Sequence, residues 1–94
     1  MVQTEKAVEF TIRGRIDIIA NILDEARNGV KKTRIMYACN LSFRQLRVYL
    51  NFLLKKGLLM VSASAEDGKS QVFKATKKGL AFLEAYRNLQ AVIS

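Results

Sequence analysis

Three hydrogen-bonding side chains, Arg44, Arg47 and Asn51, recur three and four residues apart in the middle of this sequence. That spacing places them on one side of a helix. A guanidinium can hold the edge of guanine, and a carboxamide the edge of adenine, through paired hydrogen bonds in the major groove. We interpret this side as a base-reading surface; the alternative is an ordinary solvated helix face. The predicted base contacts are Arg44, Gln45, Arg47, Val48 and Asn51.

A helix that presents this side outward needs an apolar side facing a core. Four residues with helical spacing supply it: Leu46, Tyr49, Leu50 and Leu53. Before them, Asn40 and Leu41 interrupt the preceding apolar pattern, and the Ser42 side chain can cap the N-terminus of the next helix. Residues 31–57 therefore predict a helix-turn-helix whose second helix spans 42–56.

The neighbouring segments extend this motif. An apolar helical stripe over residues 15–28 ends at Gly29, and a further helix is expected over roughly 32–39. After Gly57, the stretches LLMVS and QVFKA predict two strands around the turn signal Asp67-Gly68. A hairpin directly after a helix-turn-helix is a wing. Thr76 can cap a last helix that begins at Lys77.

The expected fold is mostly α with a small β-hairpin (α+β): a winged helix-turn-helix with a C-terminal dimerisation helix. Residues 14–75 would form the DNA-binding domain in this reading, and residues 76–94 the last helix. Residues 1–13 alternate apolar and polar positions at Val8, Phe10 and Ile12, which predicts a short strand or a loose N-terminal arm.

The distribution of charge supports a polyanionic partner. The 94-residue chain has a formal net charge of +8, and residues 31–78 hold eleven lysines and arginines against two acids. Such a balance is typical of proteins that meet nucleic acid or an anionic membrane surface. The residues predicted to contact the DNA backbone, with ordinary solvated positions as the alternative, are Lys31, Lys32, Arg34, Ser42, Lys55, Lys69 and Lys74.

Other classes of function find little support. The chain has no histidine and a single cysteine, Cys39, so neither an internal disulfide nor a metal site is expected. The acids are scattered, so no catalytic residues, cofactor or enzymatic activity are predicted. No apolar run is long enough for a signal peptide or a membrane span, which predicts a soluble, intracellular protein. With DNA as its partner, the expected location is cytoplasmic and chromosome-associated. Core positions are expected for Cys39 and for the aromatic residues Tyr37, Phe43, Phe52 and Phe73, so RNA recognition by base stacking is disfavoured.

The last helix carries two apolar sets. Phe82, Tyr86, Leu89 and Ile93 follow the a/d rhythm of a helix that pairs with another helix. Leu80 and Leu83 face elsewhere and can pack on the winged domain. We expect the first set to form a homodimer; the alternative is packing against the N-terminal arm of the same chain.

Several stretches together resemble a known family. KTRIMYACNLSFRQLRVYLNFLLKKGLL, the short hairpin and TKKGLAFLEAY are similar to archaeal winged-helix proteins that include small basic chromatin proteins. The resemblance implies binding to double-stranded DNA, an antiparallel C-terminal coiled-coil dimer, and a source in an archaeon or its virus or plasmid. The last helix is shorter here than the coil of those chromatin proteins.

Taken together, the residues and the resemblance predict a sequence-preferring double-stranded DNA-binding transcription regulator. A chromatin protein that coats DNA non-specifically is the first alternative. The second is a winged-helix docking module whose basic surface binds an acidic protein.

Overall fold

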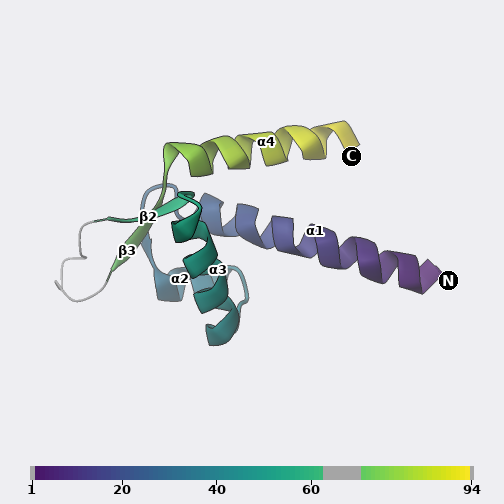
Figure 1. The fold of residues 1–94 in the computed structure, drawn as a ribbon, viewed down its shortest axis with the longest axis horizontal. Coiled ribbons are helices and arrows are strands. Elements are labelled where there is room, and N and C mark those ends of the chain that lie inside the picture. The colour runs from purple at the N-terminus through teal and green to yellow at the C-terminus, as the bar shows by residue number, and fades with distance from the viewer. Residues whose placement is uncertain (1, 63–70, 94) are drawn as a thin grey trace.

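The computed structural model describes residues 2–62 and 71–93, with side chains from Gly14 onward (Figure 1). These residues form four helices and a three-stranded antiparallel sheet, in agreement with the predicted fold class. The elements are α1 (Val2–Glu25), β1 (Val30–Lys31), α2 (Lys32–Ala38), α3 (Phe43–Lys55), β2 (Leu59–Ser62), β3 (Val72–Ala75) and α4 (Lys77–Ile93).

The turn between α2 and α3 is built as the sequence suggests. Asn40 adopts a left-handed conformation with φ of 54°, which asparagine tolerates better than most residues. The Leu41 N–H then donates to the Met36 carbonyl at 2.9 Å, which closes the end of α2. At the start of α3 the Ser42 side chain accepts a hydrogen bond from the Gln45 N–H, so the predicted N-cap is confirmed.

The sheet has the order β1-β3-β2. β2 and β3 form the expected hairpin, with Leu59 opposite Ala75 and Met60 opposite Lys74. The two-residue strand β1 is an element that the sequence pattern did not predict, and it adds Val30 opposite Phe73. The predicted turn at Asp67-Gly68 lies outside the described residues.

The core lies where α1, α2, α3 and the sheet meet. Its largest fully buried side chains are Ile22, Leu23, Ile35, Leu46 and Leu53. Ile22 and Leu23 come from α1, Ile35 is the buried residue of α2, and the two leucines come from α3. This shared core holds the helix-turn-helix against α1, so the outward side of α3 is set by which of its residues are buried.

The N-terminal segment differs from its prediction. Residues 2–13 are neither a strand nor a loose arm, because α1 runs without interruption from Val2 to Glu25. The apolar alternation at Val8, Phe10 and Ile12 had suggested a strand, but the sheet order contains no strand from this segment. Gly14 does not break the helix, which is consistent with glycine's modest cost of about 1 kcal/mol in a helix interior.

Helix α4 lies along the C-terminal part of α1 and runs antiparallel to it (Figure 1). Thr76 begins it: the Thr76 hydroxyl donates to the Gly57 carbonyl at 2.6 Å and accepts from the Gly79 N–H at 3.0 Å. Leu83 is buried, as predicted, whereas Leu80, which was predicted to pack with it, is 37% exposed. No helix among the described residues has both the length and the apolar content needed to cross a bilayer.

Candidate nucleic-acid interface

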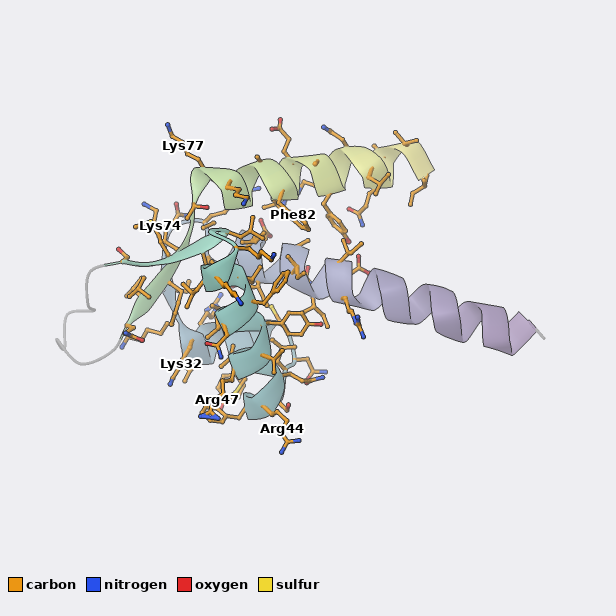
Figure 2. All side chains as sticks on the ribbon, viewed as in Figure 1. Lys32, Arg44, Arg47, Lys74, Lys77 and Phe82 are labelled. Atoms are coloured by element: carbon orange, nitrogen blue, oxygen red, sulfur yellow. The ribbon has the colours of Figure 1, made fainter. Side chains whose placement is uncertain are left out.

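The outward side of α3 is formed as the spacing predicted. Leu46, Leu50 and Leu53 are buried, and the side chains on the opposite face are exposed: Arg44, Arg47, Val48, Asn51 and Lys55. Figure 2 shows Arg44 and Arg47 at the end of the molecule farthest from α4. Neither α2 nor α3 contains an acidic residue. The structure thus brings four of the five predicted base contacts onto one solvent-facing side.

The fifth predicted base contact, Gln45, is engaged in the helix cap. Its side-chain oxygen accepts a hydrogen bond from the Ser42 N–H at 2.9 Å, while the Ser42 hydroxyl accepts from the Gln45 N–H at 3.1 Å. This reciprocal capping box satisfies two backbone donors that would otherwise lack partners. Ser42 and Gln45 therefore already have a structural role at the start of α3.

The cations at the start of α2 fall into two groups. Lys32 places its Nζ atom 5.7 Å from the centre of the Phe43 ring, which brings this charge next to α3. Arg34 instead forms an ion pair with Glu25 of α1, with 3.3 Å between Nε and Oε1. Arg34 is therefore partly neutralised, and Lys32 is the α2 cation that best extends the surface of α3.

The remaining predicted backbone contacts are spread over the molecule. Lys55 lies at the C-terminal end of α3. Lys74 is exposed on β3, and Figure 2 shows it with Lys77 toward α4 and away from Arg44 and Arg47. Lys31 lies opposite Val72 at the edge of the sheet, and Lys69 lies outside the described residues. The structure therefore does not gather this predicted set into one patch.

The prediction that the aromatic residues lie in the core is wrong for three of four. Phe73 is buried, but Tyr37 is 78% exposed, Phe43 60% and Phe52 43%. The inner side of α3 is already filled by leucines, so its two phenylalanines lie at the flanks, and Ile35 is the buried residue of the short α2. The rings of Phe43 and Phe52 place apolar area beside the arginines of α3.

Cys39 is half-buried and packs against the core, which is less enclosed than predicted. Burial, with the nearby negative charge of Glu25 as the smaller cause, raises the pKa of its thiol to about 11. The thiol therefore stays protonated at neutral pH, the form that is a poor nucleophile and a poor metal ligand. In the part of the chain that the structure describes, no cluster of cysteine and carboxylate side chains could hold a metal ion.

The predicted dimerisation residues are divided by the structure. Phe82 packs against the core of its own chain, and the Tyr86 hydroxyl donates a hydrogen bond to Asp17 of α1. Leu89 and Ile93, one and two turns further along α4, remain exposed, together with Val92. The first half of the set thus contacts its own chain, at the core and at Asp17 and not at the predicted N-terminal arm, and the second half faces solvent.

Two open clefts flank α3, and sequence reasoning missed both because their linings come from separate elements. One, of about 310 Å³, lies between α3 and the sheet. The other, of about 530 Å³, lies between α3 and α1 and includes Arg15, Arg44 and Phe52. Exposed apolar residues next to arginines are the signal in the sequence that could have indicated them.

Comparison with known proteins identifies the family to which this architecture belongs. A model of a winged helix-turn-helix family matches residues 12–94. An uncharacterized protein of Methanocaldococcus jannaschii, MJ0287, is 40% identical over 48 residues, which are 50% of this chain and 50% of that protein. The match therefore spans about half the length of this curated relative.

Several solved structures share the fold. Sso10a-2, a DNA-binding protein from Sulfolobus solfataricus, has a TM-score of 0.70 and 21% identity over 82% of this chain and 78% of that chain. S. aureus MepR in its DNA complex has a TM-score of 0.72 and 15% identity over 98% and 82%. The reduced form of MarR from E. coli has a TM-score of 0.69 and 18% identity over 81% and 54%. Because the family model covers most of its length, the chain belongs to the winged helix-turn-helix family.

Proposed function

We propose that this protein binds double-stranded DNA by inserting α3 into the major groove, and that it acts as a transcription regulator. The observation that carries the proposal is the exposed side of α3, where Arg44, Arg47 and Asn51 stand opposite a buried leucine face. Arginine and asparagine supply the paired donors that read guanine and adenine, and exposed Val48 can contact a thymine methyl group.

Two relatives support a DNA partner. Sso10a-2 is named as a DNA-binding protein, and MepR was solved in complex with DNA. Their identities to this chain, 21% and 15%, make them evidence for a shared fold; the residues on α3 carry the functional argument. Sso10a-2 and MJ0287 both come from archaea, which supports an archaeal source and a place on the chromosome in the cytoplasm.

Contacts to the phosphate backbone would come from both sides of α3. In this proposal Lys32, which lies beside Phe43, and Lys55, at the far end of α3, would meet the two strands that border the groove. The sheet would lie over the adjacent backbone as the wing, with Lys74 at its α4 side. In this arrangement Lys74 contributes less to affinity than Lys32.

A homodimer through α4 completes the proposal. Leu89, Val92 and Ile93 leave an apolar surface exposed near the end of α4, and a second copy of the same helix is the simplest partner to cover it. Two copies would present two α3 helices to two half-sites on one duplex.

The first prediction concerns the groove surface. Replacing Arg44 and Arg47 by alanine should lower duplex affinity at least tenfold without unfolding the protein, because both side chains are exposed. The matched control is Lys74→Ala with Lys77→Ala, which removes the same charge on the α4 side. Gel shifts at two salt concentrations measure both, and log affinity should fall with log salt by about 0.9 per phosphate neutralised. Equal losses in the two double variants would show that α3 is not the reading helix.

Regulator and chromatin protein differ in specificity. A regulator should prefer its operator over random duplex by ~10³ or more, whereas a coating protein should bind both nearly alike. Selection of duplexes from a random pool, followed by competition with unselected DNA, distinguishes the two.

Exposure of Tyr37 and Phe43 favours a second candidate, binding of unpaired nucleic acid, which the sequence had disfavoured. Exposed rings next to cations are the platform on which bases stack, at about 1–3 kcal/mol per base. Competition between duplex and single strands, with Tyr37→Ala as the variant, separates the candidates. If the protein binds an acidic protein and neither duplex nor single-stranded nucleic acid, the docking alternative applies instead.

A further inference from the structure

The cleft between α3 and the sheet has apolar walls. Leu46, Leu50 and Leu54 of α3 form one wall, and Val61 of β2 and Phe73 of β3 form the other. Its volume of about 310 Å³ lies at the lower end of the range for small-molecule sites, which bury most of a ligand against apolar side chains. The cleft is therefore large enough for the apolar body of a small aromatic or aliphatic ligand.

The rim of this cleft is polar and cationic. Lys32 and Arg47 supply two positive charges, and Asn51 and Gln71 supply two carboxamides. None of the described residues that line it is acidic. The Phe43 ring, 5.7 Å from the Lys32 Nζ atom, keeps that charge at the rim. Charges of one sign beside an apolar wall attract an oppositely charged ligand more strongly than they would in open water.

We propose that this cleft binds a small organic anion with an apolar body, whose negative group meets Lys32 and Arg47 while its body enters between α3 and the sheet. A neutral ligand would leave both cations without a counter-charge. A simple inorganic anion would leave the apolar walls exposed to water. An amphipathic anion satisfies both parts of the site.

The site also gives the anion a way to control DNA binding, an extension that rests on the proposed function. Arg47 and Asn51 line the rim of the cleft and are also predicted to contact bases. An anion that holds these donors removes them from the groove, so anion and duplex compete. By linkage, each must weaken the binding of the other by the same factor.

The probe for the site is 1-anilinonaphthalene-8-sulfonate, an aromatic sulfonate whose emission rises in apolar surroundings. Lys32→Met removes one cation, and Val61→Phe fills the cleft from the sheet side. Each should raise the dissociation constant of the probe at least fivefold. Circular dichroism of each variant checks the fold, and Val61→Leu is the milder filling variant if Val61→Phe unfolds.

Two control variants make the result specific. Lys77→Met removes a cation on the α4 side of the molecule (Figure 2) and should leave the dissociation constant unchanged. Phe52→Ala alters the other cleft, between α3 and α1, and should also have little effect. If Phe52→Ala abolishes probe binding, or if Lys32→Met and Val61→Phe bind it as the unaltered protein does, the assignment of the site is overturned.

The competition with DNA is tested separately. Adding duplex to the protein–probe complex should release the probe, and the probe should weaken the gel shift by the same factor. Duplex binding with full retention of the probe would overturn the competition but not the site. If no duplex binds at all, the proposed function fails, while the variant series still decides whether the anion site exists.

Discussion

At the level of single residues, several polar side chains could either contact nucleic acid or bond within the chain, and the structure shows which of them bond within the chain. Ser42 and Gln45 have the polar atoms to meet nucleic acid, yet they bond to each other's backbone and close the start of α3. Arg34 has the charge to bind phosphate, yet it pairs with Glu25. Arg44 and Arg47 lie on a helix without acidic residues, so they remain the strongest candidates for contact with DNA.

Cys39 yields a prediction about reactivity. Because its thiol has a pKa of about 11 in the folded chain, against an ordinary value of 9.0, its thiolate fraction near pH 8 is low. Alkylation by iodoacetamide should be slower than that of the urea-unfolded chain by roughly a hundredfold, since the thiolate is the reactive form. Mass spectrometry over time measures both rates, and equal rates would mean that the thiol is not shielded.

The same shift predicts a dependence of stability on pH. The folded thiol holds its proton to higher pH than the unfolded thiol, so its contribution is complete below pH 9 and is lost as pH rises toward 11. The free energy of unfolding of Cys39→Ala, from urea titrations, should fall less across this window than that of the unaltered chain. A parallel fall in both proteins would assign the loss to other groups.

At the level of elements, the pairing of α1 with α4 is the main departure from a bare winged helix. α4 is fixed at its start by Thr76 and Gly79, then by Leu83, and further along by the bonds from Tyr86 to Asp17 and from Arg87 to Asp24. The ion pair to Asp24 is exposed and contributes little. Apolar packing and the hydrogen bonds of Thr76 and Tyr86 are therefore what hold α4 in place.

Alanine substitutions at two glycines should change the free energy of unfolding in opposite directions. A Cβ atom on Gly79 would lie 2.2 Å from the Leu58 carbonyl oxygen, so Gly79→Ala should lower the free energy of unfolding by about 1–3 kcal/mol. Gly14, inside α1, has nothing within 4 Å of such an atom, so Gly14→Ala should raise it by about 0.5–1 kcal/mol. Urea titrations measure both. Destabilisation by Gly14→Ala would contradict a helix that continues through this residue.

At the level of the whole molecule, the surface of α3 and the exposed end of α4 lie at opposite sides (Figure 2). A second copy could therefore attach at α4 without covering Arg44 or Arg47. This separation is compatible with both the proposed DNA binding through α3 and the proposed dimer through α4.

Because the two surfaces are separate, we expect that dimerisation can be abolished without changing the α3 surface. Leu89→Asp with Ile93→Asp should convert a dimer to monomers in sedimentation analysis while the fold persists, because both side chains are exposed. Affinity for a duplex with two half-sites should then fall at least tenfold, and affinity for a single half-site should change little. A variant that stays dimeric would place the interface elsewhere.

The sequence by itself was enough to predict the helix-turn-helix, its Ser42 cap, the hairpin strands, the Thr76 start of α4 and the outward side of α3. These features depend on residues a few positions apart, whose spacing and capping chemistry act locally. The charge excess of residues 31–78 is likewise a property of composition.

Only the tertiary structure decided the rest. β1 exists because Val30 and Lys31 find partners in β3, more than forty residues away in the chain. Tyr37, Phe43 and Phe52 are exposed because other side chains already fill the core. Phe82 and Tyr86 contact their own chain because α4 folds back along α1. The cleft beside α3 needs walls from α2, α3 and the sheet. Each outcome depends on which faces are covered by distant elements, and a local pattern does not contain that information.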